Sequence, residues 1–70
     1  MPDTISLSLN GEARLFQAPL SVAGLLAVLE LDLRKVAVER NEEIVPRSIY
    51  ADIALVSGDI LEIVHFIGGG

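Results

Sequence analysis

Polar and aliphatic residues alternate strictly over positions 4–9, which is the period-two pattern of a strand with one buried face. The dipeptide Asn10-Gly11 follows, and it readily supplies the positive φ angles of a tight hairpin turn. Residues 12–18 are long enough to pair back before Pro19, which lacks the backbone donor that a sheet ladder needs. The opening segment therefore predicts an N-terminal β-hairpin.

The pattern then changes to a helical period. Ser21 is suited to cap a helix, because its hydroxyl can accept a hydrogen bond from a backbone N–H two or three residues further on. Apolar residues follow at spacings of i, i+3, i+4 and i+7, which places them in one stripe: Val22, Leu25, Leu26 and Leu29. We expect one amphipathic helix over about residues 22–31.

Three further strands are predicted after the helix. Residues 35–39 and 43–45 are rich in β-branched side chains, with a polar turn between them. Residues 47–56 show no clean period, and we expect a short helical turn and a loop whose apolar members fill the bottom of the core: Ile49, Tyr50, Ile53 and Leu55. After a turn at 57–59, in which Asp59 serves as a turn former, residues 60–66 are apolar on both faces. Such a strand is typically a central one.

The predicted order is β-β-α-β-β-β, an α+β fold with a mixed sheet of four to five strands and one helix packed across one face. A right-handed crossover through the helix is compatible with placing the last strand beside the first in parallel. That arrangement is the ubiquitin-like β-grasp. We expect a single domain over residues 1–66, followed by a flexible glycine tail at 67–70.

Composition removes several classes of function. The 70 residues include no cysteine and one histidine, which leaves no disulfide framework, no thiol nucleophile and no expected metal site. A formal net charge of -5 argues against nucleic acid as a partner and favours encounter with a basic protein surface. No apolar stretch approaches the roughly 18 residues that span a membrane, and we expect a cytoplasmic protein. We also expect no catalytic residue, since so small a domain rarely holds a cleft of catalytic depth.

The candidate chemistry lies in the last residues, Ile67 to Gly70. Consecutive glycines carry maximal backbone entropy, but they can enter a slot too narrow for any Cβ. The α-carboxylate of Gly70 is ionised at neutral pH. ATP could convert it to an acyl-adenylate, and a sulfur donor could then displace AMP to leave a thiocarboxylate. The alternative is that these glycines are only a disordered end.

Taken together, these motifs resemble the thiamin-pathway sulfur carrier proteins (ThiS), a ubiquitin-like family. The resemblance spans nearly the whole chain and rests on five segments: Asn10-Gly11, Ser21-Val22 before a leucine-rich helix, Val38–Asn41 with Ile44–Arg47, Gly58-Asp59, and Ile67–Gly70.

The resemblance implies that Gly70 is adenylated by an ATP-dependent activating enzyme, converted to a thiocarboxylate and used by thiazole synthase to supply the sulfur of the thiazole ring. Gly69 and Gly70 would be the family's diglycine, recognised together with the extra Gly68. The chain itself would bind no cofactor, because ATP and the sulfur donor act through the activating enzyme. Three alternatives stay open: a carrier for molybdopterin-type synthesis, a protein tag joined through an isopeptide bond, and a β-grasp module that binds partners non-covalently.

A docking surface for these two partner enzymes is expected on the last strand. If Leu61 and Ile63 face the helix, the residues that alternate with them face away from it and form an apolar surface. We hypothesise that Val64 and Phe66, with Phe16, dock the activating enzyme and the synthase, because exposed apolar patches commonly mark interfaces. The alternative is that a loop covers this face or that the face self-associates.

Overall fold

The structure, a computed structural model, describes residues 3–66, and these form strands and a helix in the predicted order. The α-helix is α1 (Val22–Val28). The strands are β1 (Asp3–Leu9), β2 (Glu12–Ala18), β3 (Val36–Arg40), β4 (Glu43–Val45) and β5 (Ile60–His65), and two single-turn 3₁₀ helices span Leu33–Lys35 and Arg47–Ile49.

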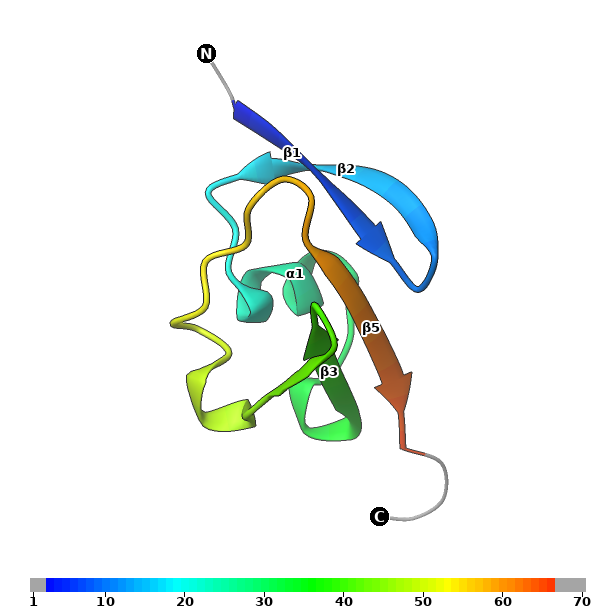
Figure 1. The fold of residues 1–70 in the computed structure, drawn as a ribbon. Coiled ribbons are helices and arrows are strands. Elements are labelled where there is room, and N and C mark those ends of the chain that lie inside the picture. Colours follow the sequence, from blue (N-terminus) through cyan, green and yellow to red (C-terminus); the bar gives the residue numbers. More distant parts are fainter. Residues whose placement is uncertain (1–2, 67–70) are drawn as a thin grey trace.

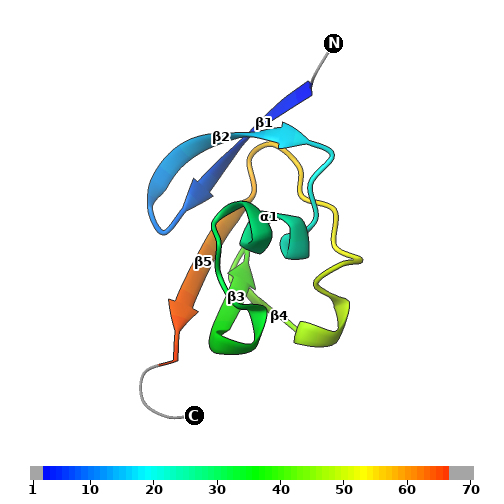
Figure 2. The same ribbon diagram turned by 180° about the vertical axis from the view of Figure 1, so that it is seen from behind.

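All five strands form one mixed sheet in the order β2-β1-β5-β3-β4. The last strand lies in the middle, as predicted, parallel to β1 and antiparallel to β3. The helix covers one face of the sheet: it lies behind β5 and β3 in Figure 1 and in front of them in the reverse view of Figure 2. The predicted β-grasp arrangement is confirmed.

The core lies between this helix and the inner face of the sheet. Alternate residues of β1, β3 and β5 contribute to it, together with one buried residue each from β2 and β4 and the apolar stripe of the helix. Its most completely buried side chains are Leu7, Val22, Leu25, Leu26, Val36, Val38 and Leu61. Tyr50 and Leu55 are buried in the segment without a clear period, while Ile49 and Ile53 pack against the core from the same segment. The irregular segment therefore closes the bottom of the core as predicted.

The helix begins as predicted, with the Ser21 hydroxyl accepting from the Gly24 backbone N–H at 2.9 Å, but it ends at Val28 rather than near residue 31. Glu30 adopts a left-handed φ of 59°, and the next residue folds back to donate to the carbonyl of Leu26 at 2.9 Å. This is the geometry of a helix end that usually carries glycine. A glutamate gives no such signal in the sequence, and for this reason the predicted helix was too long.

Four strand boundaries also differ by one residue from the prediction. Strand β1 begins at Asp3, one residue early, and β3 ends at Arg40, one residue late. Strand β3 begins at Val36 because Lys35 belongs to a 3₁₀ turn, in which the Asp32 carboxylate accepts from the backbone N–H of Arg34 at 2.9 Å. Strand β5 ends at His65, one residue early. These changes leave the order and direction of the strands as predicted.

Candidate functional site

The candidate site centres on β5, the strand that leads toward the glycines. Residues Gly68, Gly69 and Gly70 lie outside the described residues, and so does the predicted tail 67–70 as a whole. The covalent role of Gly70 and the recognition role of Gly68 and Gly69 therefore stay predictions. What the structure describes is the base from which that segment starts.

The end of β5 is held by β3. Val36 pairs with His65, and the backbone N–H of Phe66 donates to the carbonyl of Lys35 at 2.9 Å. Figure 1 shows that β5 ends at the opposite end of the molecule from the start of β1. The path of the chain is thus fixed as far as Phe66, four residues before Gly70.

On the other edge of β5, the side chain of Asn10 supplies part of the backbone hydrogen bonding. Strand β1 pairs with β5 only at Ser8 and Leu9, because the chain then turns away at Asn10. The Asn10 side chain continues the ladder: its Oδ1 accepts from the Ile63 N–H at 2.8 Å, and its Nδ2 donates to the Ile63 carbonyl at 3.2 Å. The side-chain amide of Asn10 thus makes the hydrogen bonds to β5 that a further residue of β1 would have made. The sequence analysis missed this role, because it assigned Asn10 only to the turn.

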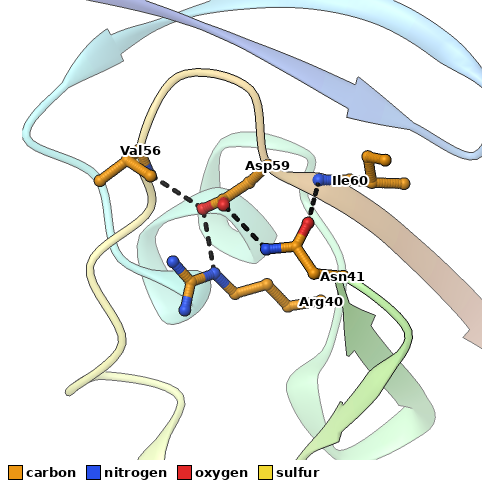
Figure 3. A network of polar contacts seen from close by, with 5 residues as sticks. All are labelled: Arg40, Asn41, Val56, Asp59 and Ile60. Atoms are coloured by element: carbon orange, nitrogen blue, oxygen red, sulfur yellow. Dashed lines mark hydrogen bonds and ion pairs between the residues drawn. The ribbon is translucent and has the colours of Figure 1, made fainter.

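The start of β5 is fixed by a polar network around Asp59, drawn in Figure 3. This carboxylate is only 4% exposed. It accepts from Arg40 Nε at 3.0 Å, from Asn41 Nδ2 at 3.1 Å and from the Val56 N–H at 2.9 Å. Asn41 also pairs with Ile60, its Oδ1 accepting from the Ile60 N–H at 2.9 Å and its own N–H donating to the Ile60 carbonyl at 2.7 Å. The network joins the β3–β4 turn to the first residue of β5.

Asp59 is therefore much more than a turn former, the role assigned to it from the sequence. Burial raises the pKa of this carboxyl, but the hydrogen bonds from Val56, Asn41 and Arg40 together outweigh burial, and the net pKa lies below its ordinary value. A carboxyl with a lowered pKa stabilises the fold at pH values above its unfolded pKa of about 3.9, and that contribution is lost as the pH falls through the folded value.

We predict that Asp59→Asn lowers the free energy of unfolding by about 2 kcal/mol at pH 7, because the ion pair and one charge-assisted hydrogen bond are lost at a buried site. The variant should also lose part of the decline in stability between about pH 5 and pH 2. Urea denaturation at several pH values measures both.

Asp32→Asn is the matched control for this prediction. Hydrogen bonds from the side chain and then the backbone of Arg34 lower the pKa of Asp32 to about 2, yet the pair lies at the surface, where ion pairs contribute little. An Asp59→Asn variant with the same stability and the same acid dependence as Asp32→Asn would contradict the structural role of the network.

From Ile60 to Phe66, the residues that face away from the helix are apolar except for Glu62. Leu61 and Ile63 are buried against the helix, so the residues that alternate with them point away from it, as expected. Val64 is 58% exposed and Phe66 is 57% exposed, and Ile60 is exposed as well. No segment among residues 3–66 covers these side chains, which removes the alternative of a covering loop for this part of the chain.

Phe16 does not belong to this surface, and its predicted place in the docking patch is wrong. It is 8% exposed and belongs to the core, because the hairpin register sets it opposite Ile5 on the inner face. The Arg14 guanidinium lies 5.4 Å from the centroid of the Phe16 ring. The large apolar residue that β2 exposes is Leu15, which directly precedes Phe16 in the chain. The sequence contains this register: pairing residues outward from the Asn10-Gly11 turn, beginning with Leu9 and Glu12, sets Phe16 opposite Ile5.

Other kinds of site find little support in residues 3–66. That part of the chain has no group of three histidine, cysteine, aspartate or glutamate residues placed to hold a metal ion. A hollow beside β4, lined by Ile44, Pro46 and Ile49 among others, measures about 150 Å³, below the roughly 300–1,000 Å³ of typical small-molecule sites. None of the helices described in the structure is long and apolar enough to cross a membrane.

Comparison with known proteins gives a consistent result. The model of the ThiS family matches residues 7–70. The sulfur carrier protein ThiS of Bacillus subtilis is 44% identical over 50 residues, which cover 71% of this chain and 76% of that protein. The crystal structure of a thiamine biosynthesis protein (ThiS) from Geobacter metallireducens superposes with a TM-score of 0.81 at 30% identity, covering 94% of this chain and 100% of that one.

Longer relatives also match. A thiazole synthase of Paramagnetospirillum magneticum is 59% identical over 66 residues, which are 94% of this chain and 20% of that protein. A thiazole synthase of Magnetococcus marinus is 44% identical over the same shares of the two chains. This chain therefore spans about a fifth of the length of these two relatives.

Proposed function

Because this chain belongs to the ThiS family, we propose that it is a sulfur carrier of thiamin biosynthesis whose reactive group is the α-carboxylate of Gly70. The observation that carries the proposal is the extent of the family match, which runs over residues 7–70 and so includes all three terminal glycines. The fold adds support, because β5 and the residue after it are held by β3 and Lys35 as far as Phe66, four residues before Gly70.

The proposed chemistry occurs in two steps at the Gly70 carbonyl. The carboxylate attacks the α-phosphate of ATP, pyrophosphate leaves, and an acyl-adenylate forms. Hydrosulfide released by the sulfur donor then attacks the carbonyl carbon, AMP leaves with the bonding electron pair, and loss of the sulfur-bound proton yields a thiocarboxylate in which sulfur replaces one oxygen. Glycine suits this chemistry, since no side chain on the α-carbon hinders the attack.

The chain is proposed to supply the reacting end group while its partners catalyse the reactions. An ATP-dependent adenylating enzyme would bind ATP and receive the sulfur donor, so that the chain binds no cofactor of its own. A thiazole synthase would accept the sulfur. Two relatives named thiazole synthase contain a region similar to nearly the whole of this chain, which supports this second partner. We place these steps in the cytoplasm.

We predict that incubation with ATP, a sulfur source and the activating enzymes of a cell extract adds to the intact mass the difference between sulfur and oxygen. A chain lacking Gly70 should show no such gain, because the reacting carboxylate would then follow Gly69, one residue short of the position proposed for chemistry. Intact-mass spectrometry measures the change directly.

The same experiment separates the alternatives. No gain under conditions that load a known carrier would contradict the covalent mechanism and favour a non-covalent module, whereas adducts on lysines of other proteins would indicate a protein tag. Loading followed by transfer of sulfur to a molybdopterin precursor, with none to the thiazole ring, would indicate a carrier for that other pathway.

We further propose that Val64 and Phe66 contact the adenylating enzyme and the thiazole synthase. Val64→Asp should slow thiocarboxylate formation by about tenfold, because a charge would enter the apolar contact. The control is Leu15→Asp, an even more exposed apolar residue on the edge strand β2, which should change the rate by less than about twofold. Single-turnover rates followed by mass spectrometry provide the test, and equal effects of the two substitutions would contradict docking at Val64.

A further inference from the structure

Two glutamates pair directly across neighbouring strands on the outer face of the sheet. Glu39 of β3 is the direct cross-strand partner of Glu62 of β5, and Ile44 of β4 is the partner of Glu39 on its other side. Residues opposite one another on a sheet have Cβ atoms about 5 Å apart. The row Ile44–Glu39–Glu62 therefore runs across β4, β3 and β5. It lies on the face of the sheet opposite the helix, and Figure 1 shows the helix behind β5 and β3.

This placement is unfavourable in the isolated chain. Like charges directly opposite one another destabilise a sheet, and neither carboxylate forms an ion pair with a basic residue in the described range 3–66. The ion pairs found in that range join Arg34 to Asp32 and Arg40 to Asp59. Within this part of the chain, therefore, no basic side chain is paired with either Glu39 or Glu62.

Apolar side chains surround the two carboxylates. Ile60 and Val64 lie before and after Glu62 on the same face of β5. Ile44 of β4, which is 76% exposed, lies beside Glu39 on the side away from Glu62. A long basic side chain fits such a surface, since its aliphatic stem packs on apolar groups while its charged head reaches the carboxylates. Arginine fits best, because its planar guanidinium can donate to two carboxylates at once.

We propose that Glu39 and Glu62 together receive an arginine or lysine side chain of the adenylating enzyme, with Ile44, Ile60 and Val64 packed around its stem. The inference rests on the proposed function for the identity of the partner. Charge supports the proposal in two ways. Within residues 3–66, Glu39 and Glu62 have no basic residue paired with them. In addition, a chain of net charge -5 associates with a basic surface faster than a neutral chain would.

The test measures binding without chemistry. The dissociation constant of the full chain for the adenylating enzyme of the same organism is determined without ATP, at several salt concentrations, for the unmodified chain and for Glu39→Gln/Glu62→Gln. We expect the double variant to bind at least about tenfold more weakly and to depend less on salt. The control Asp3→Asn/Glu12→Gln changes two exposed acids of β1 and β2 by the same net charge and should change binding by less than about threefold.

Thermal unfolding of the free chain gives an independent readout. The Glu39→Gln/Glu62→Gln variant should unfold at the same temperature as the unmodified chain or higher, because the repulsion has been removed. A lower unfolding temperature would show that the pair stabilises the chain itself and would overturn the proposal. Equal losses of affinity in the double variant and the control would also overturn it, because only the overall charge would then matter.

The outcomes also separate this inference from the proposed function. Binding that weakens as expected, in a chain that never acquires a thiocarboxylate, supports the basic contact and contradicts the sulfur carrier. Thiocarboxylate formation that proceeds equally well in Glu39→Gln/Glu62→Gln, with unchanged affinity, supports the carrier and overturns the contact. No binding of the unmodified chain to the adenylating enzyme overturns the contact outright.

Discussion

The architecture depends on satisfying both edges of β5, a central strand whose neighbour β1 accompanies it for only two residue pairs. A central strand carries backbone donors and acceptors on both edges, and a buried group left unpaired costs about 1–3 kcal/mol. Strand β3 satisfies one edge over five residue pairs. On the other edge, the side chain of Asn10 continues the ladder at Ile63. This completion lets β5 run on past the β1–β2 hairpin toward the glycines.

Apolar burial and polar contacts contribute differently to holding the strand. Leu61 and Ile63 are buried between the sheet and α1, and each such side chain contributes about 1.5–3 kcal/mol. Burial does not depend on contacts between particular atoms. It does oppose a shift of the strand register by one residue, because that shift would expose both side chains to solvent and move the outer residues into the core. The contacts of Asn10, Asn41 and Asp59 fix that register at defined atoms. The outer face is thereby fixed too, with Glu62 between Ile60 and Val64.

The sequence predicted what depends on local patterns. The hairpin turn at Asn10-Gly11, the Ser21 cap and the apolar run of β5 determined the order of the elements and the central place of the last strand. The burial of Phe16 was also accessible, because the hairpin register follows from the turn, yet the aromatic side chain was assigned to the surface. The early helix end was not accessible, since Glu30 adopts a left-handed conformation that glutamate does not signal.

Apart from the local bond between Val56 and Asp59, the polar contacts that hold β5 could not be predicted, because they join residues far apart in the chain. Asp59 lies 19 residues from Arg40, and Ile63 lies 53 residues from Asn10. Nothing in either local pattern indicates its partner, and the direct pairing of Glu39 with Glu62 appears only once the strands are in register. The glycines were identified from the sequence and the family resemblance, and the structure adds the described strand that leads to them.

A carrier that offers its last residues to other proteins needs a firm base for them, and in this account β5 is that base. Native-state hydrogen exchange at single residues tests this most directly. We predict that the amides of Ile63, bound by Asn10, and of Phe66, bound by Lys35, exchange only through openings that cost a large part of the global unfolding free energy. Exchange of both amides at the rate of an unstructured peptide would contradict the account, because β5 would then be frayed well before the glycines.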